Sequence, residues 1–457
     1  MSETCSHPPG VLFWFRHDLR LHDQVALHEA VRRARRCGGW LLPVFVHDAT
    51  QDRPTTWGFP RTHPRRLAWR AQALHDLEGQ LLALGSTLWQ CHGDPAQRLR
   101  ELVTQLGHPE VVCEDIAAPE EQAVVRTLRE AGVSVFTVWQ SSLLEPGSLP
   151  FAPEAVPDTF TVYRQLIEKA SVRAPTPLPV PTHLPPSPPV DGIRSGACTM
   201  QSDTASVGAP PVSGPGAATG NGDPRSAFPS HEPEFHGGER AALAYLRRYC
   251  ERGLPHRYKA TRNGLMGVDY SSKWSPWLST GALSARQAWA AIQSFEHERG
   301  ASDSTYWLWF ELLWRDHFRW LHWKYGTALY RPGGIKGGAS PSHDAQAFER
   351  WCRGQTGHAF IDAGMRELAS TGYLSNRMRQ NVASYLIHEL QGDWRAGAAW
   401  FESQLLDHDV YSNQGNWLYL SGRGTDPRGG RRFNPDKQAG DYDADGAYRR
   451  CWADVAR

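Results

Sequence analysis

The chain has 457 residues and a formal net charge of +1, from 49 Lys and Arg against 48 Asp and Glu. This length exceeds what one hydrophobic core normally holds and predicts two or three domains. The balanced charge excludes binding of anions through bulk charge, so an anionic partner must meet a local basic patch.

The cysteines and the apolar runs indicate the compartment. The eight cysteines form no CxxC pair, which argues against a zinc site and a disulfide framework and favours a reducing compartment. No apolar run is long enough to span a bilayer, and the polar start MSETCSHPPG has no apolar signal core. We therefore expect a soluble cytoplasmic protein without membrane contact.

Short apolar runs alternate with helix-like stretches in the first third of the chain. The runs are VLFWF (11–15), WLLPVFV (40–46), STLWQ (86–90), EVVC (110–113) and VSVFTV (133–138), and the helical stretches are 24–36, 62–84, 95–106 and 119–131. This alternation predicts a Rossmann-like α/β domain over residues 1–150, with a doubly wound parallel sheet. Because RHDLRLHD follows the first run, a G-x-G-x-x-G dinucleotide fingerprint is absent.

Residues 151–235 are predicted to be an interdomain linker, Pro-rich and of low complexity from about residue 171. Eight prolines fall between Pro175 and Pro189, and a Gly-, Ala-, Ser- and Thr-rich stretch follows them. Such a segment buries too little apolar surface to offset its ordering entropy. We expect it to be extended at first and then flexible.

From residue 236 to 457 helical patterns replace strand patterns. They are GGERAALAYLRRYC, ARQAWAAIQSFEHE, STYWLWFELLWRDHFRWLHWKYG, DAQAFERWC, FIDAGMRELAST, NRMRQNVASYLIHEL and WRAGAAWFESQLL. Ser284 and Asp344 stand at expected helix starts. The second domain is therefore predicted to be all-α.

One polar stretch of this domain precedes a helix expected near residue 276. It contains Ser271, Ser272, Lys273 and Ser275. Hydroxyls, backbone amides and a lysine at a helix N-terminus suit an anion such as a pyrophosphate. A Ser-rich helix cap is the alternative interpretation.

A second stretch, FELLWRDHFRW (310–320), places Glu311 on one helix face with Trp314 and Arg315. A surface ion pair is the ordinary interpretation. The surrounding Trp and Phe side chains instead predict near-burial, so these charges need partners.

A third stretch, GYLSNRMRQNVASYL (372–386), puts Asn376, Arg377, Arg379 and Gln380 into one helical turn. Arg377 and Gln380 fall on roughly one face of this helix, and Asn376 and Arg379 on another. Without further information the pattern indicates the basic start of a structural helix.

The fourth stretch, DHDVYSNQGNW (407–417), lies between the apolar runs WRAGAAWFESQLL and LYL. Burial of an unpaired carboxylate costs several kcal/mol, so Asp407, Asp409 and Asn413 need partners or a ligand. A loop, a metal site and the wall of a ligand site all fit this pattern. The absence of His/Cys ligand spacing disfavours metal.

Together these stretches resemble the photolyase/cryptochrome family. The matching blocks, in order, are WFRHDLRLHD, YKATRNG with DYSSKWSPWLSTGALS, ELLWRDHF with TGYLSNRMRQNVASYL, DHDVYSNQGNW, and RRFNPDKQAGDYDADGAY. They run from about residue 11 to the C-terminus and exclude the low-complexity linker. Within the family the chain is similar to DASH-type cryptochromes.

The resemblance implies a blue-light-absorbing protein that holds FAD in its helical domain. The residues expected to contact FAD are Tyr258, Ser271, Ser272, Lys273, Trp274, Ser275, Glu311, Arg315, Asn376, Arg379, Asp407, Asp409 and Asn413. Arg379 is expected to pair with Asp407. Asp409 is expected to accept hydrogen bonds at the flavin edge.

Asn413 is expected to face flavin N5. An amide can donate and accept hydrogen bonds there without supplying an acidic proton. The resemblance also implies that Trp417 and then Trp394 relay electrons to the flavin. The family's third relay tryptophan falls at Pro341 here, so either Trp320, Trp323 or a tyrosine replaces it, or photoreduction is slow.

The implied substrate is a cyclobutane pyrimidine dimer flipped out of DNA, which Glu311, Trp314 and Asn413 would process. The predicted DNA contacts are Arg262, Arg377, Gln380, Tyr419 and Arg431. Tyr419 and Gln380 depart from duplex-repairing relatives and make the cavity smaller and less apolar. We therefore expect a monomer that prefers dimers in single-stranded DNA, where less stacking is lost on flipping.

The N-terminal domain is expected to carry an antenna pigment, a reduced folate such as 5,10-methenyltetrahydrofolate. Glu120 in CEDIAAPEE is the candidate contact, with Glu121 as its competitor. The acidic first turn of an ordinary helix explains this motif equally well.

Three classes of function remain open at this stage. They are a light-driven lyase that repairs pyrimidine dimers, a signalling photoreceptor without repair, and a non-catalytic nucleic-acid binder. The presence of Glu311, Trp314 and Asn413 favours the enzyme.

Overall fold

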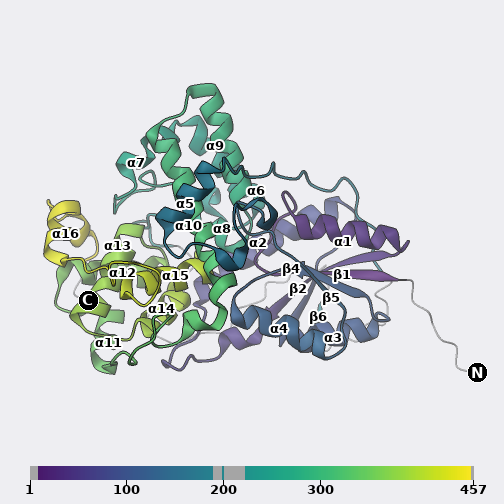
Figure 1. Cartoon of the computed structure of the whole chain (residues 1–457), viewed down its shortest axis with the longest axis horizontal. Coiled ribbons are helices and arrows are strands. Elements are labelled where there is room, and N and C mark those ends of the chain that lie inside the picture. Colours follow the sequence, from purple (N-terminus) through teal and green to yellow (C-terminus); the bar gives the residue numbers. More distant parts are fainter. Residues whose placement is uncertain (1–8, 189–197, 200–221, 454–457) are drawn as a thin grey trace, which may run out of the picture.

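The computed structural model describes residues 9–188, 198–199 and 222–453. An α/β domain and a helical domain lie side by side (Figure 1). Most of the predicted low-complexity linker, residues 189–197 and 200–221, lies outside the described residues. Its Pro-rich start, residues 172–188, contains no helix or strand, in agreement with an extended segment.

The N-terminal sheet has the strand order β5-β4-β1-β2-β3-β6. Its parallel strands are β1 (Gly10–Phe15), β2 (Trp40–Asp48), β3 (Trp89–Gly93), β4 (Glu110–Glu114) and β5 (Val135–Val138). The two-residue β6 (Cys198–Thr199) pairs antiparallel with β3. The predicted doubly wound sheet is confirmed.

Helices cover this sheet on both faces. They are α1 (Val25–Arg36), α2 (Pro64–Ala83), α3 (Pro95–Gln105) and α4 (Pro119–Glu130). All six residues of β1 are buried, as expected for a parallel strand that packs helices on both sides. Proline at the first turn of α2, α3 and α4 sets where these helices begin.

The remaining helices belong to the second domain and to the segment before it. They are α5 (Phe160–Lys169), α6 (Glu239–Glu251), α7 (Tyr258–Thr261), α8 (Ser275–Thr280), α9 (Ala285–Arg299), α10 (Asp303–Tyr325), α11 (Ala345–Cys352), α12 (Ala359–Thr371), α13 (Asn376–Ser384), α14 (Trp394–Gln404), α15 (Val410–Ser421), α16 (Pro435–Tyr442) and α17 (Ala447–Cys451). The predicted all-α domain is confirmed.

Local chemistry explains several boundaries. Ser284 caps α9 by accepting from the Gln287 amide, and Asp344 caps α11, both as expected. The helix predicted over 376–390 differs from the prediction, because α13 ends at Ser384 and a π-helical turn covers Tyr385–Glu389. No helix of the described ranges is long and apolar enough to cross a membrane.

The cysteines agree only in part with the expected thiols. Cys37, Cys113, Cys250, Cys352 and Cys451 are free, whereas Cys91 is disulfide-bonded. The described residues contain no cluster of His, Cys, Asp and Glu suited to a metal ion.

Candidate functional site

The predicted site residues come mainly from helices that pack against one another in the helical domain. α15 contacts α10, α13 and α14 (Figure 1). Side chains from FELLWRDHFRW, NRMRQNVASYL and DHDVYSNQGNW therefore meet, although up to about a hundred residues separate them along the chain. We describe an inner group around Asp407 and Asp409, and an outer group around Glu311 and Trp314.

The ion pair predicted between Arg379 and Asp407 is present. Arg379 Nη2 donates to Asp407 Oδ2 at 2.8 Å, and the Asp407 side chain is only 1% exposed. Asp407 Oδ1 is also buried but has no hydrogen-bond partner among the described residues. This oxygen can accept a hydrogen bond from a ligand.

Asp409 caps a helix and pairs with an arginine, two contacts that could not be predicted from the sequence. Its Oδ1 accepts from the Ser412 amide and caps α15, and its Oδ2 lies 2.7 Å from Arg319 Nη2. Burial favours the neutral acid, but the charges of Arg319 and Arg315 hold the pKa of Asp409 well below its usual range. The carboxylate therefore stays charged inside the domain, and its contact with a ligand edge stays a prediction.

Asn413 and Trp417 occupy successive turns of α15. The Asn413 amide is held by the backbone, since its Nδ2 donates to Ala398 O of α14 at 2.9 Å. The Trp417 indole is buried against Gly397 of α14. A Cβ added to Gly397 would lie 2.2 Å from the indole ring. The glycine therefore lets α14 and α15 approach closely around Trp417.

Lys273 differs from a simple surface anion site. Its side chain is buried, its Nζ lies 3.2 Å from the centroid of the Tyr270 ring, and Nζ has no hydrogen-bond partner among the described residues. Burial lowers the pKa of Lys273 well below its ordinary value. An anion beside this amine would restore its charge.

The short helix α8 gives less support to the predicted anion site. α8 has six residues, and Trp274 precedes it without a side-chain cap. Ser275 is exposed, Ser271 and Ser272 are partly buried, and Trp274 is buried with an indole N–H that has no partner in the described chain. Tyr258 is buried and Asn376 is exposed at the start of α13.

In the outer group, Arg262 is paired with Glu311 rather than free to meet a phosphate. Burial raises the pKa of Glu311, which the guanidinium of Arg262 opposes. Arg315 does not bond Glu311 as an ordinary helix pair would, because its guanidinium donates to the carbonyls of Ser141 and Leu278 at 2.7 and 3.1 Å.

Arg377 is also engaged within the protein. It donates to Asn263 Oδ1 at 2.9 Å and to Gln380 Oε1 at 3.1 Å. The first bond ties α13 to the segment that carries Arg262. Three of the predicted DNA contacts, Arg262, Arg377 and Gln380, therefore lie close together.

Aromatic side chains pack against one another in the outer group. Trp314 stacks on Phe160 with ring centroids 3.8 Å apart and meets Tyr419 edge-on at 5.6 Å. Arg431 donates to the Tyr419 hydroxyl and to Asp426 Oδ2. The structure thus brings Trp314, Tyr419 and Arg431 together, and their contacts with DNA stay predictions.

The predicted antenna contact, Glu120, lies at the surface and stays a prediction. The Glu120 side chain is 74% exposed and pairs with Arg61 at 2.7 Å. Its competitor Glu121 is 27% exposed and contacts Arg16 and His17. Of the two, Glu121 is the better ordered, but neither contact identifies a pigment.

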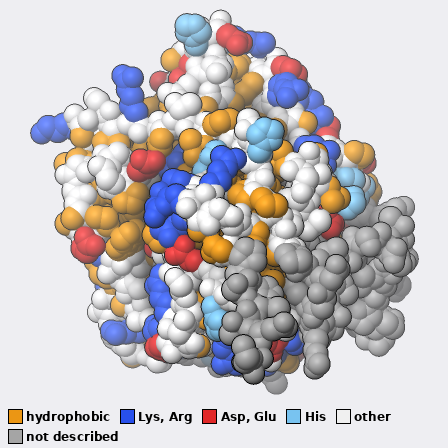
Figure 2. Space-filling model, turned by 90° about the vertical axis from the view of Figure 1, so that its right-hand side faces the viewer, with side chains coloured by type: hydrophobic (Ala, Val, Ile, Leu, Met, Phe, Trp, Pro, Cys, Tyr) orange, Lys and Arg blue, Asp and Glu red, His pale blue; other side chains and the backbone are white. Residues whose placement is uncertain are grey.

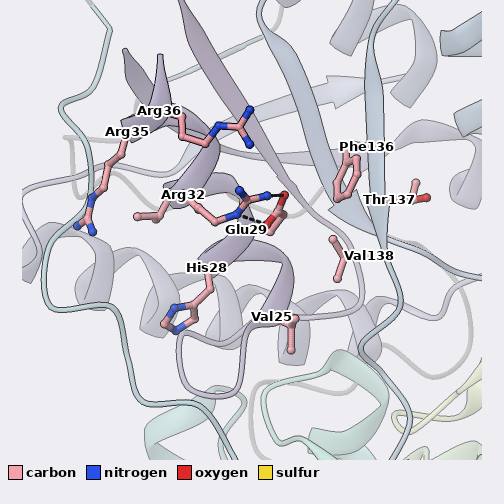
Figure 3. A pocket seen from close by; sticks show the side chains of 10 residues that line it. Val25, His28, Glu29, Arg32, Arg35, Arg36, Phe136, Thr137 and Val138 are labelled. Carbon is pink, nitrogen blue, oxygen red and sulfur yellow. Dashed lines mark hydrogen bonds and ion pairs between the residues drawn. The ribbon is translucent and has the colours of Figure 1, made fainter. Parts of the chain in front are cut away.

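Two surface cavities lie outside this group of residues. The larger, of about 990 Å³, is a groove in the α/β domain between α1 and β5, lined by Arg32, Arg35 and Arg36 of α1 and by Phe136 of β5 (Figure 3). Figure 2 shows Lys and Arg side chains gathered on this side of the molecule, which explains how a chain of net charge +1 still has basic surface. The smaller cavity, of about 400 Å³, is lined by residues 331–338 and 340.

Sequence reasoning missed several residues of the inner group. Arg319 could have been found, because it lies four residues after Arg315 on the same helix face. Tyr270, Tyr373 and Glu367 gave no local signal. Buried Glu367 accepts from the Tyr448 hydroxyl of α17, a contact between residues 81 positions apart.

Comparison with known proteins identifies the family. Residues 11–182 match the DNA photolyase family model, and residues 307–456 match the model of the FAD binding domain of DNA photolyase. A protein of Gloeobacter violaceus named cryptochrome DASH is 42% identical, and the alignment covers 97% of this chain and 85% of that protein. This chain belongs to the photolyase/cryptochrome family and is of the DASH type.

Solved structures of family members share the whole architecture. A cryptochrome from Synechocystis sp. aligns with a TM-score of 0.86 and 40% identity, over 97% of this chain and 88% of that one. A class III photolyase from Agrobacterium tumefaciens gives a TM-score of 0.74 and 27% identity, over 99% and 88% of the two chains. The helical region of this cryptochrome-type chain is therefore an FAD-binding domain.

The inner group is chemically suited to FAD. It offers an open acceptor at Asp407 Oδ1, open donors at the Tyr270 hydroxyl and the Trp274 indole, and a buried amine at Lys273. Unpaired buried polar atoms are costly, and a ligand with carbonyl, N–H and phosphate groups can satisfy all of these.

Proposed function

We propose that this protein is a light-dependent deoxyribodipyrimidine photo-lyase that repairs cyclobutane pyrimidine dimers, preferentially in single-stranded DNA. The observation that carries the proposal is the outer group itself. Trp314 of α10 meets Tyr419 of α15, Arg262 pairs with Glu311, Arg431 donates to Tyr419, and Arg377 bonds Asn263, the neighbour of Arg262.

In this proposal the inner group holds FAD, which supplies the light-driven electron. Lys273 meets a phosphate, Asp407 accepts from the ring system through Oδ1, and Asn413 faces N5 with an amide that contributes no acidic proton. The Arg319 guanidinium keeps Asp409 charged beside the ring. These side chains orient the ring and exclude water from it.

The outer group holds the dimer. Burial raises the pKa of Glu311, so a carboxyl released from Arg262 takes up a proton more readily than an exposed one and can then donate a hydrogen bond to a base carbonyl. Trp314 is already fixed by stacking on Phe160 and offers its ring to a flipped base. Binding requires Arg262 to turn from Glu311 toward a phosphate, where its contact adds salt-dependent affinity.

The proposed preference for single strands is supported by two side chains, Tyr419, which meets Trp314 edge-on, and Gln380. Tyr419 is tied by Arg431, and Gln380 by Arg377, so the wall of the site is polar and fixed. A flipped base gains less stacking energy against such a polar wall than against an apolar one. Flipping from a duplex costs a few kcal/mol that a single strand largely avoids.

A repair assay tests this proposal. We expect purified, FAD-loaded protein to remove dimers from an oligonucleotide in blue light and not in the dark, and to act faster on the single strand than on the same sequence in a duplex. Equal rates would contradict the strand preference. Photoreduction of the flavin without repair would instead identify a signalling photoreceptor.

Glu311→Gln provides a matched variant for this assay. The amide keeps the size of the carboxyl but loses the paired charge, and we expect slower repair with unchanged FAD content. Glu349→Gln is the control, because Glu349 lies on α11 with its side chain 58% exposed and its one ion pair among the described residues is with Arg353. We do not extend the proposal to a folate pigment, since Glu120 is exposed and paired with Arg61.

A further inference from the structure

The glycine-rich loop RPGGIKGGAS (331–340) ends one residue before Pro341, where relatives are expected to carry the third relay tryptophan. This loop lines the cavity of about 400 Å³. Neither the fold nor the proposed repair reaction uses it. Its own contacts show what it can bind.

Backbone contacts fix the shape of the loop. The Ile335 amide donates to Arg423 O at 3.1 Å. An added Cβ on Gly334 would lie 2.3 Å from the same carbonyl oxygen, and one on Gly333 would lie 2.5 Å from the carbonyl carbon of Gly337. Only glycine fits at these two positions, so the cavity wall is defined rather than loose.

The cavity presents positive groups. Arg331 and Lys336 line it, and Lys336 Nζ donates to Asp426 O at 2.9 Å. The amides of Lys336, Gly337 and Gly338 donate no hydrogen bond to the rest of the described chain. The nearby Asp426 carboxylate is buried and paired with Arg431, so it does not cancel these charges.

The backbone at the two glycines is suited to an anion. Gly337 has φ +73° and Gly338 has φ +100°, and an added Cβ at either position would meet no atom within 4 Å. The free amides of residues 336–338 lie at the end of a turn, and successive amides of a turn can form a concave nest that accepts anionic oxygens.

The cavity adjoins the inner relay tryptophan. Trp394 Nε1 donates to Pro332 O at 3.1 Å, and Pro332 lines the cavity. The Trp394 residue itself is only 1% exposed. A molecule in solution therefore cannot touch this indole, whereas a molecule in the cavity is separated from it by the Pro332 backbone.

We propose that this cavity binds a small organic anion that gives one electron to Trp394, of the enediolate class to which ascorbate belongs. This inference rests on the proposed photoreduction of FAD through Trp417 and Trp394. FAD held by the inner group would supply the oxidant on illumination, and Trp394 would lose one electron to it through Trp417, becoming a radical cation. The bound enediolate monoanion returns one electron to the indole and releases its remaining enol proton to water, leaving its own radical anion.

Lysine labelling in the dark tests the site without relying on photoreduction. The full-length, FAD-loaded protein is acetylated with and without ascorbate, and labelled lysines are quantified by mass spectrometry. We expect ascorbate, and also inorganic phosphate, to protect Lys336. Lys437 of α16, with its side chain 70% exposed, should stay unprotected. Equal labelling of Lys336 in all samples would overturn the proposal.

Photoreduction kinetics test the electron step. The rate should saturate with ascorbate, and Lys336→Gln or Arg331→Gln should each raise the half-saturating concentration about tenfold, as loss of one charge-assisted hydrogen bond predicts. Lys437→Gln should leave it unchanged. A rate that rises linearly with ascorbate and is equal in all variants would overturn the assignment.

Two controls separate this inference from the proposed function. FAD content and the thermal midpoint are measured for each variant to show that it folds and binds FAD. Lys336→Gln and Arg331→Gln are made separately, so that one of them can still be compared with the wild type if the other does not fold. Trp417→Phe should abolish photoreduction while Lys336 remains protected in the dark. Full photoreduction in Trp417→Phe would contradict the electron relay on which this inference rests. If ascorbate protects Lys336 but does not change the photoreduction rate, the cavity is an adventitious anion site only.

Discussion

The side-chain amide of Asn413 is fixed by its bond to Ala398 O, and this makes its proposed role testable. Asn413→Asp replaces a donor by a carboxylate oxygen that faces the same carbonyl, so we expect a loss of about 1–3 kcal/mol in stability. A proton at this position should also change which reduced form of the flavin accumulates on illumination. Absorption spectra during illumination, with thermal unfolding, measure both effects.

Asn416→Asp is the matched control for this substitution. Asn416 lies on the same helix, is exposed, and donates to Ser412 O at 2.8 Å. Its substitution should leave the spectra unchanged. Identical spectra for Asn413→Asp and the wild type would contradict the N5 assignment.

Some residue pairs could be predicted from the sequence and others could not. The Arg379–Asp407 pair was expected because a buried carboxylate required a partner and the resemblance supplied one. The partners of Asp409 and Arg262 were not, since Arg319 and Glu311 lie 90 and 49 residues away in sequence. Local spacing specifies a helix face but not which distant face meets it.

At the scale of elements, α12 and α17 meet through a buried carboxyl whose titration should be measurable. Burial raises the pKa of Glu367 to about 8, although the Tyr448 hydroxyl donates to it. An unfolded chain releases this proton near pH 4.5, so the folded state binds the extra proton between about pH 4.5 and 8. The Glu367 contribution to stability therefore falls as the pH rises through that range, by at most about 1.4 kcal/mol per pH unit.

Glu367→Gln should remove this dependence, since its amide oxygen still accepts from Tyr448 and does not titrate. We expect the free energy of unfolding, measured by urea denaturation from pH 5 to 8, to fall less for the variant than for the wild type. The relevant quantity is the difference between the wild-type and variant curves of unfolding free energy against pH. Burial also lowers the pKa of Lys273, and the titration of this lysine changes the unfolding free energy with pH in the opposite direction. Parallel curves would contradict the raised pKa.

Most elements could be predicted because their patterns are periodic and their ends carry caps. β1, β2, β4 and β5 begin within two residues of their predicted starts, whereas β3 begins at Trp89 rather than residue 86. The π-helical turn at Tyr385–Glu389 escaped prediction, since the apolar spacing of NRMRQNVASYLIHEL continues through it. Hydrophobic periodicity detects a helical face but not a change of hydrogen-bond register.

At the scale of the whole molecule, the sequence located both domains but not the contacts that join them. Arg315, expected at the flavin, bonds Ser141 O of the segment that follows β5. Tyr411 of α15 accepts from the Ala117 amide of the α/β domain at 2.7 Å. Part of the predicted site therefore also holds the two domains together.

Asp316 of α10 provides the strongest test of this interdomain contact. Its carboxylate accepts from the amides of Leu143 and Leu144 at 2.6 and 2.8 Å and is fully buried. In Asp316→Asn an NH₂ group replaces one acceptor and faces a backbone N–H, which should cost about 1–3 kcal/mol. We expect a lower thermal midpoint and faster proteolysis around residues 141–144.

The matched control is Asp303→Asn on the same helix, where the Asp303 side chain is 87% exposed and, within the part of the chain that the structure describes, pairs with Lys259 alone. Burial raises the pKa of Asp316 to about 6, against its two backbone hydrogen bonds. Protonation of the folded wild type below that pH should therefore weaken the same contact, so the proteolysis rate of the wild type should approach that of Asp316→Asn as the pH falls. If the wild type and Asp316→Asn are cleaved equally slowly at pH 7, the interdomain contact does not depend on the Asp316 carboxylate.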